Sequence, residues 1–209
     1  MPEDSKKRIL RNLYSVKSRE EQSTSSPGFN FLKDNNQPLI QTFEKKLTAV
    51  KGIFVRCQNK SELQNFIRSF CIDSAIHSVY CIEKPIEELI QNTVKVSYKL
   101  TSETKIAVTG CEYLIAQTGS VIVSTAQTHS RQSFVYPPTH IVVAGNNQLI
   151  DQLENGLDQI TRKYGEQLPS QITTITGPSR TADIEKTLVL GAHGPSKLII
   201  VYLDEKILT

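Results

Sequence analysis

The chain has 209 residues, enough to bury one substantial core, and its 38% hydrophobic and 22% charged residues are typical of a globular protein. The net charge of +3 and the absence of Trp argue against a nucleic-acid-binding protein, because such a surface needs many convergent cations and aromatic rings on which bases stack. The longest apolar run near the C-terminus, residues 198–203, is too short to span a bilayer, and the N-terminus lacks the apolar core of a signal peptide, so we expect no membrane span and a cytoplasmic location.

The first 37 residues differ in character from the rest. Residues 5–18 carry apolar side chains at helical spacing in a narrow stripe, which predicts a peripheral or partner-binding helix. Residues 20–38 are rich in Ser, Thr, Asn and Gln around Pro27-Gly28, which predicts a flexible arm, either mobile or laid across another subunit of a homo-oligomer. We therefore divide the chain into an N-terminal helix and arm, residues 1–37, and one domain, residues 38–209.

From residue 38 onward, helical and strand patterns alternate. The patterns predict helices at 39–50, 59–70, 86–92 and 148–164, a helix-like segment at 112–116, and strands at 53–57, 78–82, 105–109, 121–124, 141–144, 172–176 and 197–202. Such alternation indicates an α/β domain with a mainly parallel sheet covered on both faces by helices. The strands around Val121 and Ile141 have few helical residues between them, which suggests that part of the sheet is antiparallel or mixed.

The four cysteines, Cys57, Cys71, Cys81 and Cys111, are well separated along the chain. Zinc and iron–sulfur sites usually take their ligands from closely spaced pairs such as Cys-x-x-Cys, which this sequence lacks. We therefore expect buried free thiols, no metal site and no cofactor held by this chain.

The segment from 172 to 185 concentrates polar residues at one point. Alternating β-branched residues predict a strand, Gly177-Pro178 ends it, and Ser179 or Thr181 can cap a following helix whose first turn holds Asp183 and Glu185. Open α/β sheets bind ligands outside the carboxyl ends of their strands, so this turn is a candidate ligand site. The alternative is a capped turn in which Arg180 and Asp183 form a local ion pair.

Three further polar segments lie in the C-terminal half. The turn at 117–120 could present backbone N–H groups to an anion, Arg131 could bind a carboxylate or phosphate, and His193 between two glycines could carry a proton. Each has a structural alternative: a tight turn, a solvated Arg and a His that holds a turn. His140 directly precedes an apolar strand and is interpreted as a structural, hydrogen-bonded His. The sequence lacks the Gly-x-Gly-x-x-Gly, phosphate-loop and Gly-x-Ser-x-Gly motifs of common nucleotide-binding and hydrolase sites.

Together these segments resemble the LUD domain of the lactate utilisation protein C family. The resemblance rests on Ala-Gln-Thr-Gly-Ser at 116–120, Pro-Pro-Thr-His-Ile-Val-Val at 137–143, Thr-Gly-Pro-Ser-Arg-Thr-Ala-Asp-Ile-Glu at 176–185 and Gly-Ala-His-Gly-Pro at 191–195. It covers roughly residues 105–204. The family often has Glu where this chain has Gln117, and a neutral amide cannot act as a carboxylate nucleophile or base.

The resemblance implies a three-layer α/β fold with a mainly parallel or mixed sheet, like that of the glucosamine-6-phosphate isomerase, ribose-5-phosphate isomerase and CoA-transferase group. It also implies a cytoplasmic bacterial protein that acts with two iron–sulfur subunits in the oxidation of L-lactate to pyruvate. Whether this chain is itself an enzyme stays open. The alternatives are an independent enzyme related to the sugar-phosphate isomerases or CoA transferases, and an interaction module with a vestigial pocket.

From these segments we predict a pocket for a small carboxylate or phosphate at the carboxyl ends of the strands, with Arg180 beside the N-terminus of a helix. The candidate catalytic residues are His193, Asp183 and Glu185. The candidate ligand-binding residues are Thr118, Gly119, Arg131, Gly177, Ser179, Arg180, Thr181 and Gly194.

Overall fold

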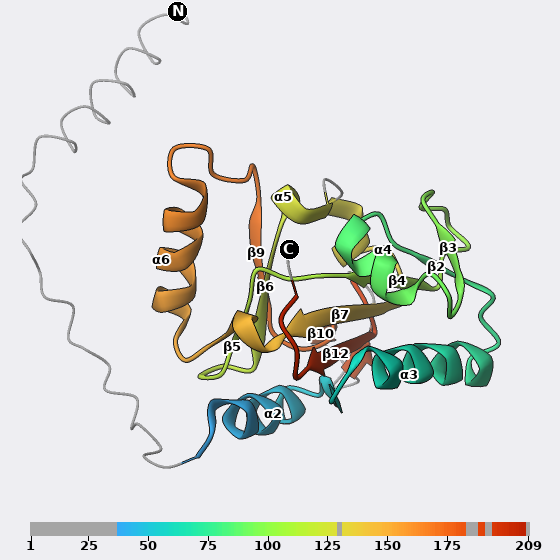
Figure 1. Ribbon diagram of the computed structural model, residues 1–209, viewed down its shortest axis with the longest axis horizontal. Helices are drawn as coiled ribbons and strands as arrows, with labels where there is room; N and C mark the ends of the chain where they lie inside the picture. The colour runs from blue at the N-terminus through green and yellow to red at the C-terminus, as the bar shows by residue number, and fades with distance from the viewer. Residues whose placement is uncertain (1–36, 129–130, 183–187, 191–193, 208–209) are drawn as a thin grey trace, which may run out of the picture. The chain divides into compact units, whose positions relative to one another are not determined.

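The computed structural model describes residues 37–128, 131–182, 188–190 and 194–207, which belong to one compact unit (Figure 1). The predicted N-terminal helix and arm therefore lie outside the described residues, apart from residue 37. The division of the chain at residue 37 stays a prediction.

A six-stranded sheet forms the centre of this unit, and all of its neighbouring strands pair in parallel. Its order is β1 (Ile53–Cys57), β12 (Lys197–Leu203), β7 (Thr139–Gly145), β4 (Ile106–Thr109), β2 (Ser78–Tyr80) and β3 (Lys95–Ser97). The prediction of a mainly parallel sheet is confirmed, and five of these strands coincide with predicted ones. Strand β3 was not predicted.

A second, mixed sheet of four strands contains β8 (Leu149–Ile150), β5 (Tyr113–Ile115), β6 (Ser120–Ser124) and β9 (Ile172–Ile175). Strand β5 pairs in parallel with β8 and antiparallel with β6, which pairs antiparallel with β9. The helix-like segment predicted at 112–116 is therefore wrong. Leu114 and Ile115 point to opposite faces and are both buried, so this strand lacks the polar alternation that marks a half-buried strand.

The helix predicted after Gly177-Pro178 is also wrong. Residues 180–182 form strand β10 (Arg180–Ala182), which pairs antiparallel with β11 (Leu188–Leu190). The potential capping residues Ser179 and Thr181 and the nearby acids favour a helix locally. Pairing with β11 supplies backbone hydrogen bonds to residues 180–182 instead, and this pairing outweighs the local preference.

Five α-helices and two short 3₁₀ helices are found in the described residues: α2 (Leu39–Ala49), α3 (Lys60–Asp73), α4 (Lys84–Ile90), α5 (Thr125–Thr128), α6 (Leu153–Tyr164), η1 (Arg131–Phe134) and η2 (Asn146–Gln148). Helix α3 begins as predicted, because the Asn59 side chain accepts a hydrogen bond from the backbone N–H of Glu62 at 3.1 Å. The helix predicted from 148 is wrong in its first turn, since β8 occupies that part and α6 begins at Leu153.

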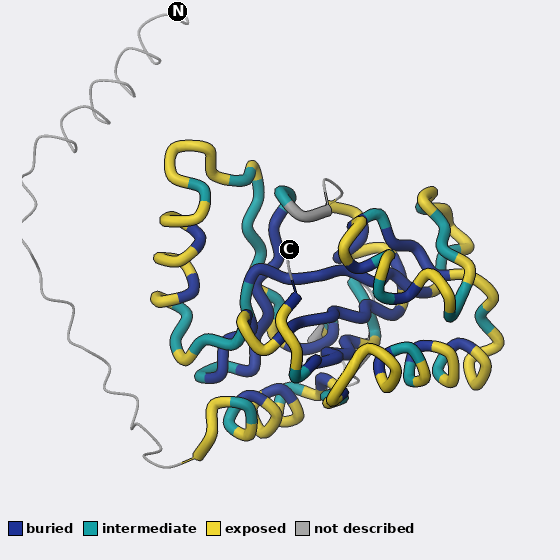
Figure 2. Tube along the Cα trace, in the orientation of Figure 1, coloured by how far each residue is buried: buried dark blue, intermediate teal, exposed yellow. Residues whose placement is uncertain are grey.

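The two faces of the six-stranded sheet are covered differently. Ile141 and Val143 face a core shared with α3 and α4, whereas Val142 and Ala144 face a core shared with α2 and the mixed sheet. Helix α6 packs through Ile160 on the outer face of the mixed sheet. Helices thus cover both faces, as expected, but on the second face α2 shares the cover with the mixed sheet. The central strands of both sheets (β4, β5, β6, β7 and β12) are largely buried, and the outer turns of the helices are exposed (Figure 2).

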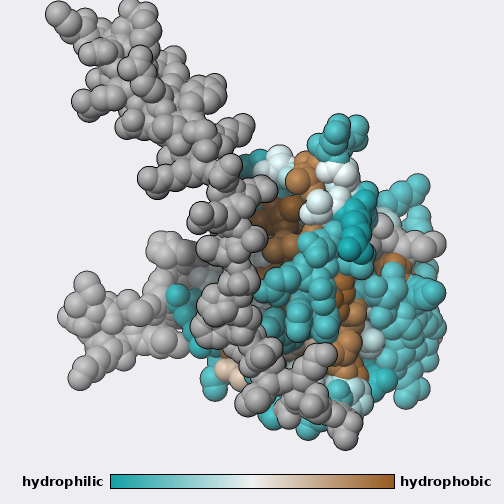
Figure 3. Space-filling view, turned by 90° about the vertical axis from the view of Figure 1, so that its left-hand side faces the viewer, coloured by the Kyte–Doolittle hydropathy of each residue, from teal (hydrophilic) through white to brown (hydrophobic). Residues whose placement is uncertain are grey.

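The face of the unit that carries α6 is mostly hydrophilic, with hydrophobic side chains showing between the polar ones (Figure 3). Glu154, Asp158 and Arg162 of α6 are exposed, while Ile160 is buried. Helix α6 therefore separates a polar outer side from an apolar inner side, as its sequence pattern predicts.

Candidate functional site

A cleft of about 370 Å³ lies at the amino-terminal edge of the six-stranded sheet, where β7 and β12 begin; we call it the His140 cleft. Its walls come from the segment after η1, from the starts of β7 and β12, from β9 with its following turn, and from the loop before β12. The lining residues are Phe134, Val135, His140, Thr173, Thr174, Ile175, Thr176, Gly177, Pro178, Ser179, Arg180, Gly194, Pro195 and Leu198.

The turn after β9 is held by close backbone packing. Gly177 has a φ of +77°, and a Cβ at this position would lie 2.4 Å from the carbonyl oxygen of Val50 at the end of α2. The backbone N–H of Ser179 donates to the carbonyl oxygen of Pro195 at 2.8 Å, which joins this turn to the loop before β12. Residues far apart in sequence are thereby brought to one cleft.

Arg180 is the one charged side chain among the described residues that line the cleft. It is exposed, and its guanidinium donates a hydrogen bond to the carbonyl oxygen of Val50, which caps the C-terminus of α2. A cation is stabilised at this negative end of a helix dipole. The expectation that Arg180 lies beside a helix N-terminus is therefore wrong. The negative end of the α2 dipole is the electrostatic partner of its side chain in the protein without ligand.

His140 lies on the inner wall of the cleft and is fully buried. Its Nε2 is 2.8 Å from Thr109 Oγ1, which in turn donates to the carbonyl oxygen of Gly110 at 3.0 Å. Its Nδ1 has no hydrogen-bond partner among the described residues. Burial lowers the pKa of His140 to about 4, so the ring is neutral at physiological pH.

Four of the predicted ligand-binding residues, Gly177, Ser179, Arg180 and Gly194, line this one cleft, and Thr181 follows in β10. The cleft lies at the amino ends of the parallel strands, so its predicted place at the carboxyl ends is wrong. The candidates His193, Asp183 and Glu185 lie outside the described residues.

The other predicted residues lie elsewhere. Thr118 and Gly119 form the turn between β5 and β6, where Gly119 has a φ of +68° and its Cα packs on the backbone of α2. Arg131 lines a separate pocket of about 390 Å³ and donates to Ser170 Oγ at 3.1 Å. Their expected convergence with Arg180 is not found in the cleft lining.

Sequence reasoning missed His140 as a cleft residue, although its interpretation as a buried, hydrogen-bonded His is correct. Its place depends on β7 packing against the mixed sheet, and no local pattern reports that packing. One pattern could have indicated it. Side chains alternate along a strand, so His140 and Thr109 lie on the face of the sheet away from α3 and α4, and a hydrogen-bonded polar pair could have been predicted there.

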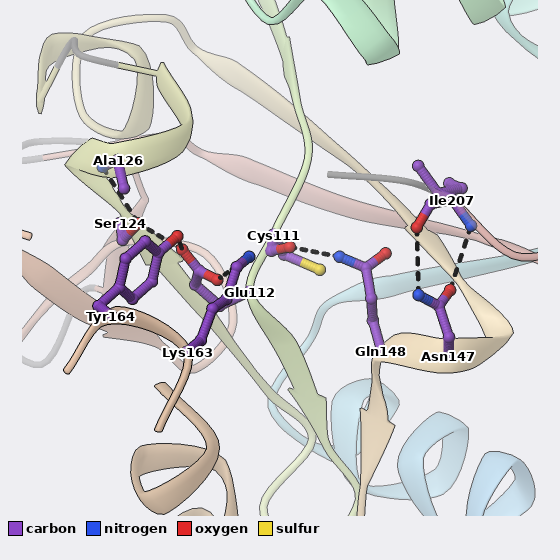
Figure 4. A network of polar contacts seen from close by, with 9 residues as sticks. All are labelled: Cys111, Glu112, Ser124, Ala126, Asn147, Gln148, Lys163, Tyr164 and Ile207. Carbon is purple, nitrogen blue, oxygen red and sulfur yellow. Dashed lines mark hydrogen bonds and ion pairs between the residues drawn. The ribbon is translucent and has the colours of Figure 1, made fainter. Parts of the chain in front are cut away.

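Two buried carboxylates lie at the opposite, carboxyl-terminal edge. Glu112 accepts hydrogen bonds from Ser124 Oγ at 2.5 Å and Tyr164 Oη at 2.8 Å, and forms an ion pair with Lys163 Nζ at 3.0 Å (Figure 4). In the same view Gln148 donates to the backbone carbonyl of Cys111. Both carboxylate oxygens of Glu112 are thus satisfied.

The carboxylate of Glu83 has fewer hydrogen-bond donors than that of Glu112. Its Oε2 accepts the backbone N–H of Gly110 at 2.9 Å, whereas its Oε1 is buried with no partner among the described residues. Burial is the main cause that raises the pKa of Glu83 to about 7. Glu83 can therefore hold a proton near neutral pH.

The four cysteines are free and buried, as predicted, and burial raises the pKa of Cys57 to about 11 and of Cys81 to about 12. The described residues contain no group of three or more His, Cys, Asp or Glu side chains placed to hold a metal ion. Within the same residues, no helix has the length and apolar character needed to cross a membrane.

Comparisons with known proteins find relatives that are named for lactate utilisation. The chain is 30% identical over 106 residues to the lactate utilization protein C of Bacillus licheniformis, which covers 50% of this chain and 44% of that protein. It is 27% identical over 124 residues to the protein of the same name in Bacillus subtilis, covering 58% and 52% of the two chains. The chain thus spans about half the length of these curated relatives.

A crystal structure of a DUF162 family protein from Deinococcus radiodurans has a similar fold, with a TM-score of 0.59 at 19% identity, covering 79% of this chain and 96% of that one. The model of the LUD domain matches residues 82–203, a range that takes in the whole mixed sheet and every residue that lines the His140 cleft. More than half of the chain matches, and the chain belongs to the LUD domain family.

Proposed function

We propose that this chain is a component of a bacterial, cytoplasmic L-lactate utilisation system and that its His140 cleft binds a small carboxylate. The observation that carries the proposal is the cleft itself, which lies within the LUD domain match and has one cation and no acid among its described lining residues. A single guanidinium suits a monoanion, because Arg presents parallel N–H donors to the two oxygens of a carboxylate.

The proposal extends to partners and fold. Relatives that are named for lactate utilisation match this chain over about half of their own length, which supports a role in the same process. We infer that iron–sulfur subunits carry out the oxidation of lactate to pyruvate and that this chain serves them as a subunit or accessory. We also infer a relation to the three-layer fold of the sugar-phosphate isomerases and CoA transferases.

Deleting the gene and supplying variants in its place tests the cellular role. We expect the deletion strain to lose growth on L-lactate while growth on pyruvate is unaffected, since only the oxidation step is missing. Wild type and Arg56→Met should restore growth, because Arg56 lies near the carboxyl end of β1, away from the amino-terminal edge that holds the cleft, in an exposed ion pair with Asp204. Arg180→Met should restore it poorly. Normal growth of the deletion strain on L-lactate would refute the role.

The alternative of an independent enzyme acting on a sugar phosphate makes a different prediction. A phosphate carries nearly twice the charge of a carboxylate and is usually bound by several cations or by a helix N-terminus. The described lining offers Arg180 alone. Titration with ribose 5-phosphate and L-lactate in parallel separates the two, and tighter binding of the sugar phosphate would favour the enzyme.

A further inference from the structure

We propose that His140 determines specificity in the cleft: its unprotonated Nδ1 accepts a hydrogen bond from a ligand hydroxyl, so that the site prefers a 2-hydroxy acid to the corresponding keto acid. This inference rests on the proposed function, namely that the cleft binds a small carboxylate. The inference specifies the chemical group next to the carboxylate of the ligand, which is a hydroxyl.

The tautomer of His140 follows from its hydrogen bonds. Thr109 has one hydroxyl hydrogen, and the carbonyl oxygen of Gly110, at 3.0 Å, can only accept it. With this hydrogen given to Gly110, Thr109 Oγ1 acts as the acceptor in its 2.8 Å contact with His140 Nε2, so we assign the proton of the neutral ring to Nε2. The remaining nitrogen, Nδ1, carries a lone pair and no hydrogen.

That lone pair lacks a partner among the described residues. A buried acceptor left without a hydrogen bond costs about 1–3 kcal/mol, and a ligand that supplies the donor recovers this cost on binding. His140 and Arg180 line the same cleft, so we infer that a ligand whose carboxylate binds Arg180 places its neighbouring group against Nδ1.

The combination of the two residues selects a chemical class. Arg180 offers donors to an anion, whereas Nδ1 of His140 offers an acceptor. A 2-hydroxy acid has both complements, a carboxylate and a hydroxyl. A 2-keto acid has acceptors only, so its carbonyl oxygen would meet the lone pair of Nδ1 and be disfavoured.

Calorimetric titration of the full chain with L-lactate, pyruvate and propionate tests this selection, because all three are small carboxylates of the same charge. We expect wild type to bind L-lactate about three- to tenfold more tightly than the other two, the range of one neutral hydrogen bond. Thr109→Val removes the acceptor that orients Nε2, and should reduce the preference to less than about twofold. Thr109→Ser keeps the hydroxyl and should retain it.

Nitrogen-15 spectra of His140 in the protein without ligand give a second, independent reading, since they distinguish a protonated ring nitrogen from a bare one. We expect Nε2 to be protonated in wild type and Thr109→Ser, and a mixture of tautomers in Thr109→Val. A proton on Nδ1 in wild type would overturn the inference. Equal binding of all three acids would overturn the preference and leave the carboxylate site standing, whereas binding of none would remove both.

Discussion

Glu112 and Glu83 are both buried at the carboxyl-terminal edge of the sheet, but their charges are compensated to different degrees. Glu112 has hydroxyl donors on one oxygen and an ammonium on the other. Glu83 has one backbone donor and a second oxygen without a partner among the described residues. The same side-chain chemistry thus produces a stabilising network in one place and a proton-binding group in the other.

Replacing Glu112 should destabilise the fold. Glu112→Gln leaves the half-exposed Lys163 without its counter-charge and places amide hydrogens against the hydroxyl donors, and a buried polar group that loses its partner costs about 1–3 kcal/mol. Urea unfolding measures this change. Glu154→Gln on the exposed side of α6 is the matched control and should change stability by less than about 0.5 kcal/mol. Equal effects of the two variants would show that the network contributes nothing.

Replacing Glu83 should stabilise the protein above neutral pH. The folded-state pKa of Glu83 is raised to about 7 from 4.5, so the folded form binds its proton more tightly than the unfolded chain, and stability falls as pH rises from about 4.5 to 7. Glu83→Gln removes this loss, which amounts to about 3 kcal/mol at most. Unfolding curves at pH 5 and pH 8 should therefore show a stabilisation at pH 8 that is much smaller at pH 5. A constant difference would contradict the assignment.

Helix α2 holds two glycine-containing turns in place. The turn between β5 and β6 lies against its backbone, and the turn after β9 lies against Val50, which directly follows its last residue. Both turns need a glycine with positive φ, because a side chain at Gly119 or Gly177 would overlap main-chain atoms of the helix. The position of α2 therefore governs one wall of the His140 cleft.

Substitution of two glycines separates backbone strain from this packing. Gly119 and Gly165 both have positive φ, but a Cβ at Gly119 would lie 2.2 Å from the backbone nitrogen of Leu47, whereas a Cβ at Gly165 meets nothing within 4 Å. Gly165→Ala should cost about 1–3 kcal/mol, the backbone strain alone at a φ of +54° and a ψ of −125°, and Gly119→Ala should cost more, because overlap with α2 adds to its strain. Thermal unfolding compares them. Similar losses would mean that the turn does not depend on contact with α2.

Elements whose pattern is decided locally could be predicted from the sequence. Five of the six parallel strands and α3, with its Asn59 cap, were predicted because their apolar periods and capping residues are continuous. Strand β5 was not, because it buries side chains on both faces, and β10 was not, because its local signals favour a helix start and its pairing with β11 overrides them. The grouping of the turns at Gly177 and Gly194 in one site was predicted correctly. Which edge of the sheet holds these turns depends on the order of the strands, and local sequence patterns do not determine that order.

In the molecule as a whole, the two edges of the parallel sheet have different roles. The carboxyl-terminal edge holds Glu83 and Glu112 in a packed interior, and the amino-terminal edge opens into the His140 cleft. Open α/β sheets usually bind ligands at the carboxyl ends of their strands. Here the mixed sheet supplies β9 and its following turn to the other edge, and so builds the cleft there.

The opposite pKa shifts at the two edges should make stability nearly independent of pH in a middle range. The pKa of His140 is lowered from 6.5 to about 4, so the stability that neutral His140 contributes is lost as pH falls from 6.5 to 4. The pKa of Glu83 is raised from 4.5 to about 7, so the stability that its protonation contributes is gained as pH falls from 7 to 4.5. Wild type should therefore vary little between about pH 4.5 and 6.5. In Glu83→Gln, stability should rise by about 1.4 kcal/mol per pH unit there. A flat profile in the variant would contradict the opposition.

The central claim, that the His140 cleft is the carboxylate site, is tested most directly by following backbone amide NMR signals during titration with L-lactate. The account predicts saturable shifts with one dissociation constant at Gly177, Ser179 and Gly194. It predicts none at Ser170, in the pocket of Arg131, or at Asp151, in a pocket beside α6. Shifts that gather at Ser170 or Asp151, or the absence of any saturable shift in the His140 cleft, would contradict it.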